Sequence, residues 1–140
     1  MTTKKWLKVL FAVEITNFLV QLPYYYHQYY ALRYLPPSAP GVLLMGAVLI
    51  WFLGGYYLLY RGTLSGYRIM MAFLSVEFLF YLQTQIVQAL SGNGVLLHVI
   101  DPRDPVLFIV FAVGYANFYA AGWFWLYLRA HKGSIVHLDK

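Results

Sequence analysis

Apolar residues fill four long stretches of the chain, and charged side chains are almost confined to the segments between them. Residues 34–60 and 105–128 contain no charged side chain, while residues 9–32 and 69–100 contain a single glutamate each. A helix that spans a bilayer needs about 20 mostly apolar residues. The pattern therefore predicts four transmembrane helices, near residues 9–26, 42–60, 69–90 and 106–128.

Other arrangements fit the pattern less well. Helices of a soluble bundle would carry polar outer faces, and the strands of a membrane barrel would alternate apolar with polar residues. Hydrophobic residues make up 61% of the sequence and charged residues only 11%, against about 25% charged in soluble domains. We therefore expect an all-α, polytopic integral membrane protein, a single four-helix transmembrane domain over residues 1–140.

Basic residues predict the orientation of the bundle, because cytoplasmic loops carry an excess of lysine and arginine. With the N-terminus inside, only Arg33 and Arg103 lie outside. The eight others are then cytoplasmic: Lys4, Lys5, Lys8, Arg61, Arg68, Arg129, Lys132 and Lys140. Both termini are thus expected in the cytoplasm. Tyrosine and tryptophan gather near the span ends as aromatic belts, as amphipathic rings do at the headgroup level.

The connections differ in character. Three prolines between Gln28 and Gly41 predict a stiff, extended external loop. The short segment Arg61–Arg68 contains two glycines and predicts a tight turn between antiparallel neighbours. The third connection, Ser91–Pro105, has an apolar middle over residues 95–100, either an interfacial loop or a lid over the bundle.

The two glutamates of the sequence, Glu14 and Glu77, each lie inside an apolar stretch. Ionisable residues in such positions usually face the bundle interior and mark pathways or binding sites. Polar residues follow each glutamate at helical steps of three and four, so each span carries one polar face. The candidate proton- or ligand-binding residues are Glu14, Asn17, Gln21, Glu77, Tyr81, Gln85, Gln88 and Asn117.

The two glutamates also lie at similar depth on helices that run in the same direction. Glu14 is six residues beyond Lys8 and Glu77 is nine beyond Arg68. If the first and third helices face each other, the two carboxyls meet without a lysine or arginine to neutralise them. We then expect at least one to hold a proton near neutrality. Interhelical hydrogen bonding alone is the alternative role for such polar residues.

A faint internal repeat supports a division into two parallel hairpins. Val13-Glu14 recurs as Val76-Glu77, and the glycine-aromatic segment 54–61 resembles 121–129. Such halves would be related by an axis along the membrane normal.

One local likeness to a known family is present. The segment from Asn17 to Tyr25, Asn-Phe-Leu-Val-Gln-Leu-Pro-Tyr-Tyr, is similar to a Gln-Leu-Pro-aromatic stretch in the four-span family of sterol isomerases and sigma-2-type receptors. It covers nine residues, lies in the first helix rather than the second, and has Asn17 where that family has a carboxylate. The resemblance implies a lipid-like or apolar ligand.

Three functional hypotheses remain from the sequence. The first is a proton-linked carrier or channel-like protein that uses the carboxyl pair. The second is an accessory or assembly subunit of a larger membrane complex, and the third is a protein or enzyme that binds a lipid-like ligand. We expect membrane lipid as a partner, a homo-oligomer or a larger membrane complex, and a small-molecule or lipid-like ligand.

The sequence contains no motif for a cofactor or a metal. The sequence has no cysteine, no zinc spacing and no phosphate-binding loop, so we expect no cofactor and no metal site. Catalytic residues are not identifiable, and an enzyme is the less favoured class. The basic residues need no nucleic acid to explain them. The expected location is a prokaryotic cytoplasmic membrane, with several spans.

Overall fold

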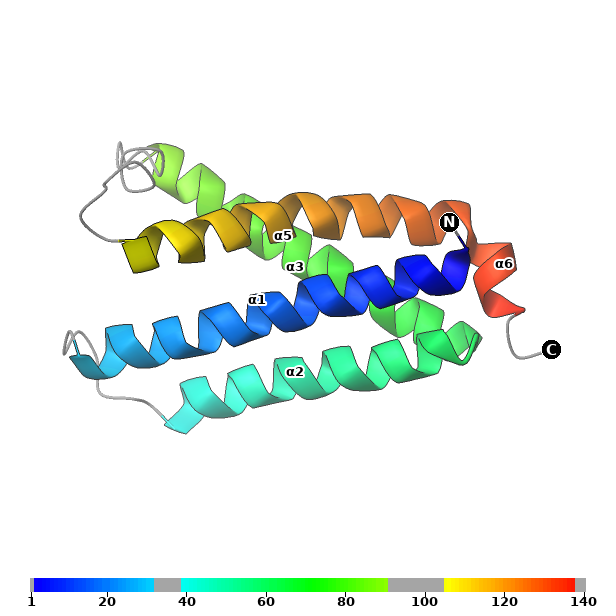
Figure 1. Cartoon of the computed structure of the whole chain (residues 1–140), viewed down its shortest axis with the longest axis horizontal. Helices are drawn as coiled ribbons and strands as arrows, with labels where there is room; N and C mark the ends of the chain where they lie inside the picture. The colour runs from blue at the N-terminus through cyan, green and yellow to red at the C-terminus, as the bar shows by residue number, and fades with distance from the viewer. Residues whose placement is uncertain (1, 32–38, 91–104, 138–140) are drawn as a thin grey trace.

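In the computed structural model, the part of the chain that is described forms four long helices, arranged as an antiparallel bundle, and one short helix after the last of them (Figure 1). The structure describes residues 2–31, 39–90 and 105–137. The helices are α1 (Thr3–Ala31), α2 (Ala39–Tyr60), α3 (Leu64–Leu90), α5 (Pro105–Ala130) and α6 (Lys132–Val136). No strand occurs in these three ranges, so the prediction of an all-α fold is confirmed.

The long helices extend past the predicted spans. Helix α1 begins six residues before the predicted start at residue 9 and continues to Ala31, through Pro23. Helix α2 begins at Ala39, which places Pro40 in its first turn, where the missing N–H of proline costs nothing. The first connection is therefore shorter than the predicted loop from Gln28 to Gly41. Apolarity marks where a helix is buried, whereas the helix itself can continue into polar sequence.

Each long helix packs against two of the others. Helix α3 has its most extensive contacts with α2 and α5, and α1 packs against α5 and, more lightly, against α2. Helices α1 and α3 are therefore diagonal in the bundle. Figure 1 shows α3 crossing obliquely behind α1 and α5, with the start of α1, the end of α5 and helix α6 at one end of the bundle.

The turn between α2 and α3 is tight because three residues suit it. Gly62 has a φ of 76°, in the left-handed region that glycine adopts readily, and its N–H donates to the Leu59 carbonyl. Thr63 caps α3, since its hydroxyl oxygen accepts the Gly66 N–H at 3.0 Å. A Cβ at Gly66 would lie 2.2 Å from the Leu59 nitrogen, so only glycine permits this approach.

A cluster of aromatic rings forms one part of the hydrophobic core. Phe52 of α2 is fully buried, and its ring lies 5.3 Å from that of Phe73 and 6.0 Å from those of Phe11 and Phe18, measured between centroids. Ring pairs at these distances add about 0.5–1.5 kcal/mol each beyond their buried area. These ring contacts thus join α1, α2 and α3 in the core.

The two glycines of the predicted repeat, Gly55 and Gly122, both lie against α3. A Cβ at Gly55 would meet Ile69 and Met70, and one at Gly122 would meet the Phe78 ring at 3.2 Å. Small residues on both neighbours let the oblique α3 approach α2 and α5 closely.

Helix α6 folds back onto the end of the bundle. It contacts α2, α3 and α5, and Ile135 is fully buried there. This contact closes the end at which α1 begins.

Among the residues that the structure describes, no helix combines the length and the apolar character needed to cross a membrane. Several predictions fall outside the described residues: the proline-rich segment over 32–38, the apolar middle of the third connection, and the side chains of the tyrosines near the end of α1.

Candidate functional site

Glu14 lies in the first half of α1, inside the bundle. Its side chain is 0% exposed, and neither carboxyl oxygen has a hydrogen-bond partner among the described residues. Because a buried polar group without a partner costs about 1–3 kcal/mol, such groups are rare and call for an explanation.

Asn117 of α5 connects the second glutamate to the bundle interior. Its Nδ2 donates a hydrogen bond to Oε1 of Glu77 on α3. The Asn117 side chain is 1% exposed, and its Oδ1 is buried without a partner, as is Oε2 of Glu77. Glu77 is partly exposed as a whole, so the pair reaches from the interior towards the bundle surface.

The structure brings the two carboxyls together. The electrostatic neighbours of Glu14 are Glu77 and Asn117, and no basic side chain is among them. The side chains of Glu14 and Glu77 approach each other across the diagonal of the bundle, because α1 and α3 are not packed directly against each other. Two neighbouring carboxylates repel each other when both are ionised, so the arrangement suits two carboxyls that share a proton.

A second polar contact lies one turn further along α1. The hydroxyl oxygen of Tyr81 on α3 lies 3.3 Å from Nδ2 of Asn17, which can donate to it, and 3.4 Å from Oδ1 of Asn17, which can accept from it. Gln21 follows on the same face. A Cβ at Gly114 would lie 3.7 Å from Gln21 Nε2 and 3.8 Å from Tyr81 Cε1, so both side chains pack where α5 has no side chain.

Six of the eight predicted site residues thus fall into two groups, the first made of Glu14, Glu77 and Asn117 and the second of Asn17, Gln21 and Tyr81. The other two, Gln85 and Gln88, are in α3, but their side chains are outside the described residues. No group of three or more His, Cys, Asp or Glu side chains in the described residues is placed to hold a metal ion.

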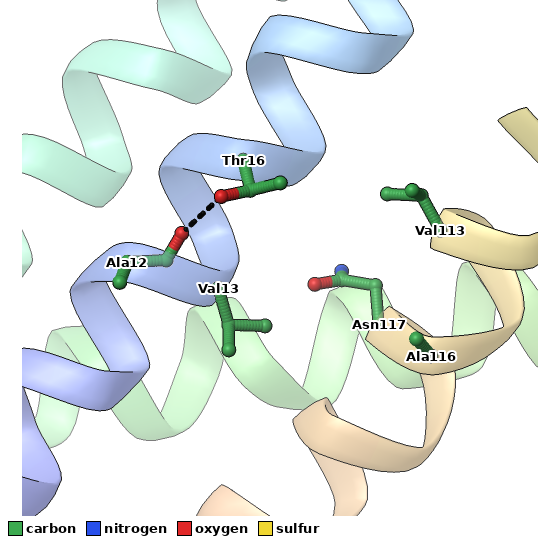
Figure 2. Close-up of a pocket in the computed structure, with 6 residues that line it drawn as sticks. All are labelled: Ala12, Val13, Thr16, Val113, Ala116 and Asn117. Carbon is green, nitrogen blue, oxygen red and sulfur yellow. Dashed lines mark hydrogen bonds between the residues drawn. The ribbon is translucent and has the colours of Figure 1, made fainter. Parts of the chain in front are cut away.

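An open hollow of about 280 Å³ lies between α1 and α5; Asn117 borders it, whereas Glu14 and Glu77 are not among its lining residues. Figure 2 shows Asn117 pointing from α5 into the space that faces α1, with Val113 one turn away on the same helix. The Thr16 hydroxyl on the opposite wall donates to the Ala12 carbonyl at 2.7 Å. The lining residues are Ala12, Val13, Thr16, Val113, Ala116 and Asn117.

The sequence did not indicate this hollow. Thr16 is next to Asn17 but on a different face of α1, and Val113 and Ala116 resemble any other apolar residues of the span. The four-residue alanine spacing that includes Ala116 is typical of close helix packing. In the structure Ala116 lines an opening instead.

A further interhelical hydrogen bond lies nearer the α6 end. Trp125 Nε1 of α5 donates to Ser75 Oγ of α3 at 2.9 Å, and the Ser75 hydroxyl in turn donates to the Met71 carbonyl. This contact holds α3 to α5 independently of the glutamates.

Comparison with protein-family models, with curated proteins and with solved structures finds no match for this chain.

Proposed function

We propose that the protein is a four-helix membrane protein and that Glu14 and Glu77 form the proton-binding centre of a small carrier. The observation that carries the proposal is the carboxyl pair. Glu14 is fully buried, its oxygens have no hydrogen-bond partner, and its nearest ionisable neighbour is another carboxyl. Such a pair is poorly suited to packing and well suited to binding a proton or another cation.

The distribution of polar and apolar side chains supports a lipid environment. Buried polar residues occupy the interior, whereas large apolar side chains on all four long helices face outward. One example from each helix, more than half exposed in every case, is given by Leu19, Ile50, Leu79 and Leu126. Soluble monomers rarely expose so many large apolar residues, since the hydrophobic effect would bury them against one another.

Cation–aromatic contacts at the α6 end of the bundle support the proposed orientation. The Arg61 guanidinium lies 5.9 Å from the Tyr57 ring, that of Arg129 lies 5.3 Å from Trp125, and Lys132 Nζ lies 5.5 Å from Tyr67. Basic side chains beside amphipathic rings are typical of a cytoplasmic membrane interface. The proposal places both chain ends on that side.

The membrane location is tested by fractionation. After expression, the protein is expected to stay in the membrane pellet through an alkaline carbonate wash and to be released by detergent. Recovery in the aqueous fraction after that wash would contradict the proposal.

The carrier function is tested by proton flux into liposomes loaded with a pH-sensitive dye. Glu14→Gln and Glu77→Gln keep the side-chain size but cannot release a proton, so each is expected to reduce flux at least tenfold. Ser75→Ala is the matched control, because it removes an interhelical hydrogen bond of the same bundle and leaves both carboxyls. Circular dichroism checks that all variants remain helical.

Unchanged flux in both glutamine variants would refute the role of the pair. Equal losses in the Ser75→Ala control would show that helix packing, rather than protonation, limits the measurement. An accessory-subunit role predicts a different result: no flux from the purified protein, and stoichiometric recovery of other membrane proteins in mild detergent.

A further inference from the structure

Three basic side chains lie where the contact between α3 and α5, the α3–α5 seam, reaches the α6 end of the bundle. They are Arg68 of α3, Arg129 of α5 and Lys132 of α6, and all three are exposed. Figure 1 shows α6 running from the end of α5 towards the start of α3, and α6 contacts both helices. The seam therefore ends in a group of positive charges.

The register between α3 and α5 places Arg68 beside Lys132. Ser75 of α3 faces Trp125 of α5, because their side chains are hydrogen bonded at 2.9 Å. Eight residues earlier on α3, Tyr67 faces Lys132, whose Nζ lies 5.5 Å from the centre of the tyrosine ring. Arg68 is seven residues before Ser75, about two helical turns, and so shares its face of α3. Arg68 thus lies on the face of α3 that meets α5 and α6.

Arg129 approaches the same place from α5. It is one turn beyond Trp125, and its guanidinium lies 5.3 Å from the Trp125 ring. Stacking of this kind uses the flat face of a guanidinium and leaves the N–H donors at its edge for an anion. Lys132 follows three residues later, so three cations with free donor capacity surround the end of the seam.

No negative charge balances this group within residues 2–31, 39–90 and 105–137. The carboxyl side chains in these ranges are Glu14 and Glu77. Glu77 is nine residues from Arg68 on the same helix, about 13 Å along its axis. Positive charges without a counter-charge repel one another, so an anion bound among them stabilises the arrangement.

The surface further along the seam is apolar. Ala72 and Leu79 continue the Arg68 face of α3 at steps of four and seven, and both are exposed, Leu79 by 60%. Leu79 is eleven residues beyond Arg68, about 16 Å along the helix, which is close to half of a hydrocarbon core about 30 Å thick. An occupant that matches this surface carries an anionic group at one end and a hydrocarbon chain behind it.

We propose that the α6 end of the α3–α5 seam binds an anionic phospholipid, with its phosphate among Arg68, Arg129 and Lys132 and an acyl chain along Leu79. The inference rests on the membrane location proposed above and not on the carrier role. Basic side chains attract anionic lipid additively, so three of them together select an anionic over a zwitterionic headgroup.

The headgroup preference is tested with phosphatidylglycerol and phosphatidylcholine that have the same acyl chains. Each is added to the purified protein in detergent, and bound lipid is counted by native mass spectrometry. Phosphatidylglycerol is expected to bind at least tenfold more tightly, and equal affinities would overturn the proposal. Inorganic phosphate has the charge without the chains and is expected not to displace the lipid. Displacement would show a site for a soluble anion and overturn the assignment to a lipid.

The location is tested by removing one charge at a time. Arg68→Gln and Arg129→Gln are each expected to lower the affinity for phosphatidylglycerol about fivefold, the contribution of one basic side chain near an anionic lipid surface. Lys5→Gln is the matched control, because it removes one exposed charge at the same end on α1, which is diagonal to α3. Its affinity is expected to stay within twofold of the unaltered protein. An equal loss in the control would show general attraction to a basic end and refute a site at the seam.

This inference and the proposed function fail separately. Recovery of the protein in the aqueous fraction after the carbonate wash would contradict the membrane location itself. Protein that stays in the membrane pellet but binds both lipids equally would overturn the lipid site alone. Selective binding of phosphatidylglycerol without proton flux would support the lipid site and overturn the carrier.

Discussion

Replacement of Glu14 by methionine is expected to stabilise the fold while it removes one half of the proposed proton-binding pair. Methionine is unbranched like glutamate and adapts well to irregular interior spaces. Glu14 is fully buried, so the substituted side chain occupies the same interior position. The direction of the change in stability depends on what Glu14 contributes to the native structure.

The magnitude follows from the hydrogen bonds that Glu14 lacks. Both of its carboxyl oxygens are buried without partners, and leaving such a group unsatisfied costs about 1–3 kcal/mol. Glu14→Met removes that cost, because methionine brings no polar group that needs a partner. We therefore expect the free energy of unfolding to rise by about 1–3 kcal/mol.

The assay is equilibrium unfolding in mixed micelles, followed by circular dichroism at one fixed pH. Ile15→Met is the control, because Ile15 is a half-buried neighbour on the same helix and a swap of similar volume costs less than about 1.5 kcal/mol. Proton flux of the same Glu14→Met preparation is expected to be lost. A decrease in stability of 1 kcal/mol or more would show that Glu14 holds the helices together, and the reasoning for a functional pair would then fail.

Two further predictions concern the frame around the site. Gly66→Ala is expected to destabilise the protein by about 3 kcal/mol or more, because its Cβ would lie 2.2 Å from the Leu59 backbone nitrogen. The control Gly133→Ala is expected to be neutral, because a Cβ there meets nothing within 4 Å. Equal stabilities of the two variants would contradict the tight turn. Trp125→Phe is expected to cost about 0.5–1.5 kcal/mol through loss of its bond to Ser75, and a double-mutant cycle with Ser75→Ala should show that the two losses are not additive.

Much of the helical architecture was predictable, because it follows from local features. The four uncharged or nearly uncharged stretches became α1, α2, α3 and α5, and the glycines of the α2–α3 connection predicted its turn. The helix ends were less predictable, since α1 continues through Pro23 into polar sequence. The Thr63 cap was not anticipated, although a threonine directly before a helix is a recognisable signal.

The site was predictable in its residue types rather than in its partners. Helical periodicity placed Glu14, Asn17 and Gln21 on one face, but it could not say that Asn117 would donate to Glu77. Such pairing depends on the rotation of each helix about its axis, which tertiary packing determines. The hollow was unpredictable for the same reason, because a void is a property of how helices fit together.

The diagonal placement of α1 and α3 has a mechanical consequence. Glu14 is carried by α1, whereas Glu77 is carried by α3, which packs closely against α2 and α5. Any displacement of α1 relative to α3 therefore changes the spacing of the carboxyls and with it their affinity for a proton. By thermodynamic linkage, binding or release of that proton acts back on the position of α1 with the same free energy. The carboxyl pair would therefore couple the proposed proton binding to the position of α1 relative to α3.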